Sequence, residues 1–294
     1  MSADPGVVPL PPPARHDVGL GTAYERWAVY QRLEKWLEDR EVATALEGPV
    51  DGMAGIPGLH LVPAAARGAR VTVLVPDAGA AGTVRGVYAT LGLSDRLDVR
   101  ASAEWPAETF DLVLTYNALP SVPDWKGYLA DAAARARRHL FVSVTHPASY
   151  GVFVRKALRL LQPGPKPLEL FDHPSTRPGT LTPELERHGR IVGDAFVDCP
   201  WWPDLFVETG ETLLTGTLSR LPFGGRFRRG PAAEAPAGGE PFLYGPGRFP
   251  FLGGDGWADE LEPALKRHPN LDGRRLRALA GLLAHHRMRA VVRA

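Results

Sequence analysis

Apolar residues change their spacing along the chain, and each change indicates a different kind of element. Over residues 22–40 they recur every three or four positions, which predicts an amphipathic helix with Thr22 and Glu25 as a capping box. From Val42 onward they gather in short runs separated by helical stretches, which is typical of a parallel α/β sheet. The predicted strands are residues 42–46, 70–75, 97–100, 110–115 and 140–144, and the helices between them are residues 58–67, 80–91 and 125–138.

This succession predicts a doubly wound, mostly parallel sheet with flanking helices, because parallel strands are joined by right-handed helical crossovers. After Val144 the alternation weakens. Further helices are predicted at residues 149–161, 183–188, 204–218, 257–267 and 272–285, with strands at 191–197 and 286–294 and a Pro-rich loop at 163–178.

The organisation suggests one domain with a tail and two insertions. Residues 1–20 hold five prolines without apolar periodicity and predict a flexible tail, followed by a single domain over residues 21–294. The insertions are expected at about residues 148–190 and 222–256. In the second, 16 of 35 residues are Gly or Pro, and its aromatic side chains favour a mobile cover over a pocket. These aromatics are Phe242, Tyr244, Phe249 and Phe251.

Composition narrows the class of protein. The 294 residues are 44% hydrophobic and 23% charged, values at which a globular core forms. With 34 Lys+Arg against 33 Asp+Glu the net charge is +1, which argues against a general polyanion-binding surface. No apolar run approaches a membrane span and the N-terminus has no apolar signal region, so a cytoplasmic location is expected. The single Cys199 excludes an internal disulfide.

The end of the first predicted strand carries the first candidate chemistry. Glu47 closes this strand, and Gly48, Gly52 and Gly55 follow in the turn to the next helix. A Gly-rich turn at the carboxyl edge of a sheet lets the polar groups of a nucleotide or nucleoside approach the backbone. The spacing is not Gly-x-Gly-x-x-Gly, and the glycines are equally compatible with a turn that is tight for structural reasons alone.

Three segments together resemble the class I S-adenosylmethionine-dependent methyltransferases. They are Ala45-Leu46-Glu47-Gly48, then Ala66 to Val73 (Ala-Arg-Gly-Ala-Arg-Val-Thr-Val), and then Phe110 to Leu119, which opens with Phe-Asp-Leu-Val. The resemblance covers about residues 24–147 and depends on the order and spacing of the segments. It implies a Rossmann-like methyltransferase fold and S-adenosylmethionine as the cofactor.

The resemblance also assigns cofactor contacts. The methionine part and the ribose would fall to Glu47, Gly48, Asp51 and Gly52, where a carboxylate suits the cofactor's cationic groups. The family's ribose-binding acid aligns with Val75, so either Asp77 substitutes for it or ribose recognition has moved. The remaining candidate cofactor contacts are Ser102 and Ala103 near the adenine, Asn117 after the fourth strand, and Tyr24 beside the first helix's aromatic stripe.

The acceptor side is less informative. Tyr116-Asn117-Ala118-Leu119 stands where nucleic-acid amine methyltransferases have Asn-Pro-Pro-Tyr, which makes a nucleic-acid partner less favoured. His146, just past the fifth strand, is the candidate catalytic base, because histidine titrates near neutral pH, although a loop histidine that only caps a strand end fits the same position. His285-His286 lacks the partner spacing of a metal site, so no metal is expected.

The function predicted is an S-adenosylmethionine-dependent methyl transfer to a small lipophilic or anionic molecule. A basic C-terminal stretch from Ala264 leaves peripheral membrane contact open. The alternative is a non-catalytic cofactor-binding or scaffold protein of the same fold, favoured by Pro49, Asp51 and Met53 at the family's glycine positions. A nicotinamide-dependent oxidoreductase fits less well because the turn lacks the dinucleotide spacing.

Overall fold

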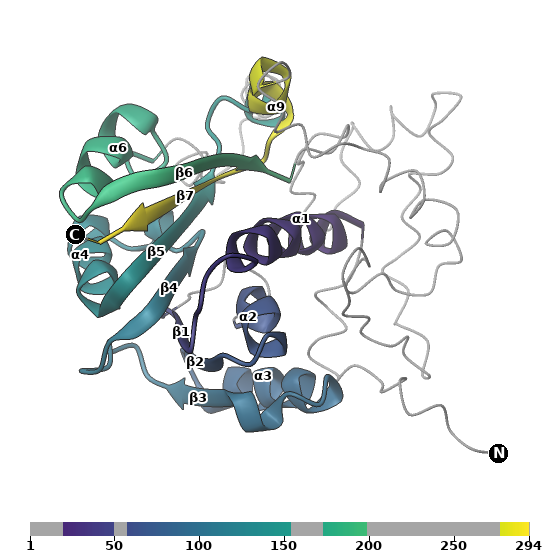
Figure 1. The fold of residues 1–294 in the computed structure, drawn as a ribbon. Coiled ribbons are helices and arrows are strands. Elements are labelled where there is room, and N and C mark those ends of the chain that lie inside the picture. The colour runs from purple at the N-terminus through teal and green to yellow at the C-terminus, as the bar shows by residue number, and fades with distance from the viewer. Residues whose placement is uncertain (1–19, 50–57, 154–172, 199–276, 294) are drawn as a thin grey trace, which may run out of the picture.

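The computed structural model describes residues 20–49, 58–153, 173–198 and 277–293 (Figure 1). Seven strands form one sheet in the order β3-β2-β1-β4-β5-β7-β6. All neighbouring strands pair in parallel except β7, which is antiparallel to both β5 and β6. The strands are β1 (Thr44–Glu47), β2 (Arg70–Val75), β3 (Leu97–Ala101), β4 (Phe110–Tyr116), β5 (Ala136–Thr145), β6 (Arg190–Val197) and β7 (His286–Val292).

Helices cover both faces of this sheet. α1 (Leu20–Leu37), α2 (Val62–Ala66) and α3 (Ala78–Thr90) pack on one face, and α4 (Trp125–Arg135) and α6 (Pro178–Glu186) pack on the other (Figure 1). α9 (Arg277–Leu283) precedes β7. Three short 3₁₀ turns complete the described elements: η2 (Leu59–Leu61), η3 (Ser94–Arg96) and η4 (Leu119–Ser121).

The sheet confirms the doubly wound, mostly parallel architecture. Every residue of β4 is buried, as expected for a central parallel strand covered on both faces, and this explains why most of its residues are apolar. One hydrophobic cluster joins α1, α2 and α3 to the sheet, and a second joins α4 and α6 to it. Among the described residues, no helix combines the length and apolarity needed to cross a lipid bilayer.

Several predicted boundaries differ from the observed ones. The helix expected to reach residue 138 ends at Arg135, because Ala136 already pairs with Phe110 and begins β5. The short helix expected at residues 183–188 begins at Pro178, since proline is tolerated in a first helical turn. The closing strand is confirmed, and it lies inside the sheet rather than at its edge. The predicted helices at residues 204–218 and 257–267 and the segment 222–256 lie outside the described residues.

Asp111, the acid of the Phe-Asp-Leu-Val motif, ties strands together at the amino end of the sheet. Its Oδ2 accepts hydrogen bonds from the backbone N–H groups of Ala43 and Thr44 at 3.0 and 3.2 Å. Burial would raise the pKa of this carboxyl, but these two donors and the charges of Arg137 and Arg138 hold it below its usual range. The motif therefore fixes the start of β1 against β4 and lies away from the carboxyl edge.

We expect Asp111→Ala to lower the free energy of unfolding by about 2 kcal/mol, because two backbone donors in partly buried hydrogen bonds lose their acceptor. Since the folded-state pKa is depressed, this contribution is present above pH ~4 and is lost as the pH falls through the folded-state pKa. Urea unfolding at pH 7 and at pH 3 measures both effects. Asp131→Ala, on the exposed face of α4, is the control. Equal destabilisation by the two variants at pH 7 would contradict this role.

Candidate functional site

Polar side chains from strands far apart in sequence meet at the carboxyl edge of the sheet. β1, β4, β5 and β6 run in one direction and end there, whereas the antiparallel β7 begins there. His286 of β7 accordingly pairs with both Thr145 of β5 and Val197 of β6. The residues brought to this edge are Glu47, Tyr116, Asn117, His146, Asp198, His285 and His286.

Glu47 is wholly buried where β1 ends. Its Oε1 lies 2.9 Å from Nδ1 of His60, which is also wholly buried and comes from η2. In the described part of the chain, neither Oε2 of Glu47 nor Nε2 of His60 has a hydrogen-bond partner. A buried carboxylate oxygen is costly to leave unsatisfied, so this atom marks a place for a donor or cation that the described residues do not supply.

The structure describes the turn after β1 up to Pro49 and again from Gly58. The candidate contacts Asp51 and Gly52 therefore lie outside the described residues. Gly48 is required at the first end, because an added Cβ would lie 2.5 Å from the Trp105 ring and 2.9 Å from the Tyr128 hydroxyl. That hydroxyl donates a hydrogen bond to the backbone oxygen of Pro49 at 2.8 Å.

The far end of the turn is held in the same way. Gly58 has a φ of +83°, and a Cβ there would come within 2.7 Å of the Val73 side chain. The Tyr88 hydroxyl donates to the backbone oxygen of Gly58 at 2.8 Å, and the Tyr30 hydroxyl donates to that of Leu59 at 2.5 Å. Burial, reinforced by the charge of Glu47, raises the pKa of Tyr88, which therefore stays a neutral donor. Both ends of the turn are thus fixed by tyrosine hydroxyls.

The candidate ribose and adenine contacts lie beyond β2 and β3. Asp77 is exposed and caps α3, because its Oδ1 accepts from the backbone N–H of Ala80 at 2.8 Å. Ser102 Oγ accepts from the backbone N–H of Glu104 at 3.0 Å, and Ala103 is exposed. Oδ1 of Asp77 and the hydroxyl oxygen of Ser102 therefore each accept one hydrogen bond from the neighbouring backbone. The second carboxylate oxygen of Asp77 is left for another donor.

Asn117, just past β4, is buried with a φ of +50°, in the left-handed region that asparagine tolerates better than most residues. Its Nδ2 lies 2.7 Å from Nε2 of His286. The structure therefore joins Asn117 to the start of β7 rather than to Glu47. Tyr24 lies in α1, and its side chain is outside the described part of the structure.

His146 lies at the same edge but faces β6 and β7. Its ring packs edge-on against Phe196 with centroids 5.0 Å apart, and its backbone N–H donates to His285 at 2.7 Å. Burial and then the nearby Arg287 lower the pKa of His146 to about 4. The imidazole is therefore neutral at pH 7 and able to accept a proton, although its low pKa makes it a weak base.

Sequence reasoning missed a second group of polar residues at this edge. The Tyr116 hydroxyl donates to Oε1 of Glu25 at 2.6 Å, and the Tyr116 ring stacks on His60 with centroids 4.0 Å apart. Nδ1 of His285 lies 2.9 Å from Oδ2 of the buried Asp198. Of these residues, Glu25 was interpreted only as a helix cap, and His285 only as one of two adjacent histidines.

The mostly parallel sheet with flanking helices and the acid that closes β1 agree with the Rossmann-like architecture implied by the sequence resemblance. The chain has a Rossmann-like α/β fold. No protein-family model and no curated protein matches it.

Several solved structures are similar to this chain. Magnesium protoporphyrin IX methyltransferase from Synechocystis PCC 6803, with bound SAH, is 17% identical with a TM-score of 0.47, covering 64% of this chain and 81% of its own. The glycopeptide N-methyltransferase MtfA is 14% identical with a TM-score of 0.41, covering 58% and 82%. The StiE O-MT, residues 961–1257, is 10% identical with a TM-score of 0.45, covering 90% and 72%.

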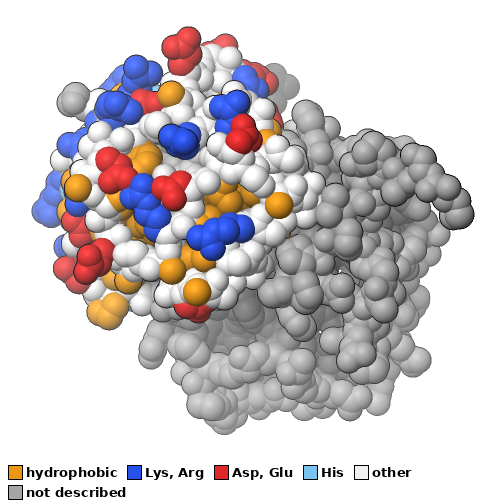
Figure 2. Space-filling model, turned by 90° about the horizontal axis from the view of Figure 1, so that it is seen from below, with side chains coloured by type: hydrophobic (Ala, Val, Ile, Leu, Met, Phe, Trp, Pro, Cys, Tyr) orange, Lys and Arg blue, Asp and Glu red, His pale blue; other side chains and the backbone are white. Residues whose placement is uncertain are grey.

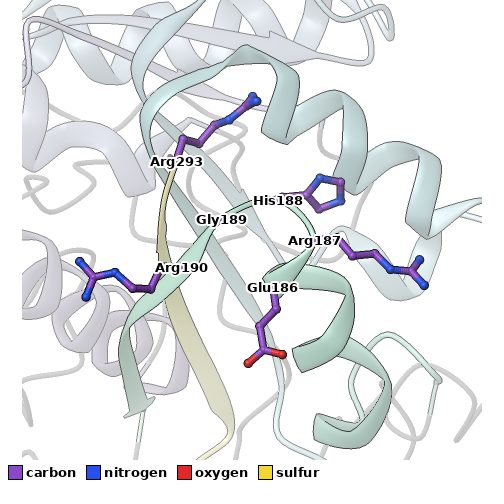
Figure 3. A pocket seen from close by; sticks show the side chains of 6 residues that line it. All are labelled: Glu186, Arg187, His188, Gly189, Arg190 and Arg293. Atoms are coloured by element: carbon purple, nitrogen blue, oxygen red, sulfur yellow. The ribbon is translucent and has the colours of Figure 1, made fainter.

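A surface hollow of about 600 Å³ lies elsewhere on the molecule, around the start of β6 and the end of β7. β6 has eight residues, so this place is roughly 25 Å from the carboxyl edge. Its arginine side chains diverge instead of converging on one point (Figure 3). The hollow is therefore separate from the candidate site. Its lining residues are Glu186, Arg187, His188, Gly189, Arg190 and Arg293.

We expect the His146 imidazole to titrate near pH 4 in the folded protein, and proton-detected NMR of the ring measures this directly. An unfolded histidine titrates near pH ~6.5, so between these values the unfolded chain binds a proton that the folded chain does not. Stability should therefore fall as the pH is lowered through this window, and His146→Gln should flatten that part of the profile. Titration near pH 6.5 would instead show a ring open to water.

Proposed function

We propose that this protein is an S-adenosylmethionine-dependent methyltransferase that acts on a small molecule. The observation that carries the proposal is Glu47, a wholly buried carboxylate at the end of β1 whose Oε2 has no hydrogen-bond partner among the described residues. It adjoins Gly48 and a turn fixed at both ends by tyrosine hydroxyls. The similar Synechocystis enzyme was crystallised with SAM and with SAH, and MtfA with SAM, which supports the same cofactor here.

The residues present fit this cofactor. Glu47 would offer its free oxygen to the cofactor's methionine part, Asp77 its free oxygen to a ribose hydroxyl, and Ser102 its hydroxyl to the adenine amine. S-adenosylmethionine supplies, when bound, a methyl group on a positively charged sulfur. The protein then has to hold the acceptor in line with that methyl group and to exclude water.

His146 is proposed to receive the acceptor's proton. It lies at the same edge as Glu47, and its Nδ1 has no hydrogen-bond partner within the described ranges. Because the pKa of His146 is about 4, its imidazole is already neutral at pH 7 and can accept a proton directly. Such a weak base serves best when the acceptor's own pKa is lowered by another group.

A small acceptor fits the surface better than a nucleic acid does. On the face shown in Figure 2, Lys and Arg side chains alternate with Asp and Glu and do not form a basic band. Arg100, for example, pairs with Asp98 and Glu108 on β3 and the loop after it. Binding a nucleic-acid backbone requires a continuous positive surface. A lipophilic or anionic small molecule is the acceptor class that we propose.

A non-catalytic cofactor-binding protein is the second candidate. Asp77 is already engaged as a helix cap, and Trp105 and Tyr128 fill the space above Gly48. Both features restrict the space available at the proposed cofactor site. Calorimetry with SAM, SAH and NAD separates three outcomes: an enzyme or a cofactor-binding protein binds SAH, a scaffold binds none of the three, and an oxidoreductase binds NAD. Methyl transfer from SAM then distinguishes the enzyme from the cofactor-binding protein.

We expect Glu47→Ala to weaken SAH binding at least tenfold, which corresponds to about 1.4 kcal/mol, because the free carboxylate oxygen is lost. Isothermal titration calorimetry measures the affinity. Glu41→Ala, in the exposed residues just before β1, removes a carboxylate of the same type and should leave the affinity unchanged. Unchanged SAH affinity in a folded Glu47→Ala protein would place the cofactor elsewhere.

Asp77→Asn should weaken SAH binding several-fold while the melting temperature stays nearly the same, because asparagine caps a helix about as well as aspartate. Asp124→Asn is a matched control, since Asp124 caps α4 through the N–H of Gly127 in the same way. Calorimetry and thermal unfolding of both variants separate binding from capping. Equal SAH affinities in the two variants would show that Asp77 is only a helix cap.

A further inference from the structure

Three side chains from separate parts of the chain converge at the carboxyl edge of the sheet, next to the proposed cofactor site. Glu25 comes from α1, Asp198 follows β6, and His286 begins β7. One potential ligand atom from each lies within 4.8 Å of the other two. Nδ1 of His286 is 3.6 Å from Oδ2 of Asp198, close to the ~3.4 Å between neighbouring ligands of a tetrahedral ion with bonds of ~2.1 Å.

Each of these three side chains has a further partner that orients it. Glu25 accepts from the Tyr116 hydroxyl at 2.6 Å, and Asp198 is 2.9 Å from Nδ1 of His285. His286 is 2.7 Å from Asn117 through Nε2, the nitrogen that faces away from Asp198. Metal ligands are typically held in this way, with a second hydrogen-bonded group behind each one.

Asn117 gives an independent indication. It is buried, and its Oδ1 has no hydrogen-bond partner in the part of the chain that the structure describes. A histidine that binds an ion through Nδ1 carries its proton on Nε2 and needs an acceptor there. Rotation of the Asn117 amide by half a turn would bring Oδ1 to Nε2 of His286 and provide that acceptor.

The charges at this place favour a cation. Asp198 is buried, and its Oδ2 lies 2.9 Å from Nδ1 of His285 and 3.6 Å from Nδ1 of His286. A carboxylate in the protein interior needs compensating positive charge.

We propose that Glu25, Asp198 and His286 bind one divalent transition-metal ion. One imidazole and two carboxylates form a donor set that suits Zn²⁺, Mn²⁺ and Co²⁺, and three protein ligands leave at least one position open. An oxygen of the acceptor would fill that position, where the ion lowers the pKa of the bound hydroxyl. This last role rests on the proposed methyltransferase function, and it would allow a base as weak as His146 to suffice.

The test is a titration of the chelator-treated full chain with Co²⁺. Visible absorption reports the coordination of this ion, and calorimetry with Zn²⁺ gives the stoichiometry and affinity. We expect one ion per chain. Glu25→Gln should weaken binding at least tenfold while it keeps an acceptor for Tyr116. Glu34→Gln, the same substitution on α1 at a residue that pairs with Arg67, should bind as the unchanged protein does.

Binding of SAH to the same ion-free sample separates the two proposals. If SAH binds but Co²⁺ produces no visible bands, or binds equally to Glu25→Gln, the metal site is wrong and the proposed function stands. If Co²⁺ binds as expected and SAH does not, the site holds an ion in a protein that is not a methyltransferase. Loss of Co²⁺ binding in Glu34→Gln as well would contradict the assignment of Glu25 as a ligand.

Discussion

A buried carboxylate must find a positive or hydrogen-bonding partner, and two such groups determine what meets at the carboxyl edge of this sheet. Glu47 and Asp198 are both buried there, at the ends of β1 and β6. Each is paired with a histidine later in the chain: His60 is 13 positions after Glu47, and His285 is 87 positions after Asp198. The positions of η2 and of the start of β7 therefore depend on these two pairs as well as on apolar packing.

The antiparallel β7 is what brings the second pair into place. A parallel strand in the same position would carry residues 285 and 286 to the amino edge, next to the arginines around the surface hollow. Because β7 runs the other way, its first residue pairs with the last residues of β5 and β6. One reversal of strand direction thus converts the C-terminal part of the chain into part of the candidate site.

The elements that the sequence predicts well are those with a local signal. Short, largely apolar runs identify β2 and β4, and an aspartate before a helix identifies the cap at Asp124. The contacts of the site have no such signal: Asn117 and His286 are 169 positions apart, and Asp198 and His285 are 87 apart. A pair of adjacent histidines looks unremarkable until the sheet order is known. The Phe-Asp-Leu-Val motif identifies the fold through its acid, which holds strands together away from the site.

Tyr116 links the two carboxylate groups physically. Its ring stacks on His60, the partner of Glu47, and its hydroxyl donates to Glu25 beside Asp198. Burial, followed by the charge of Glu25, raises the pKa of Tyr116, so the hydroxyl remains a donor at any physiological pH. The proposed cofactor place and the proposed ion place are neighbours joined by one side chain, which is the arrangement needed if an acceptor held at one is to meet a methyl group held at the other.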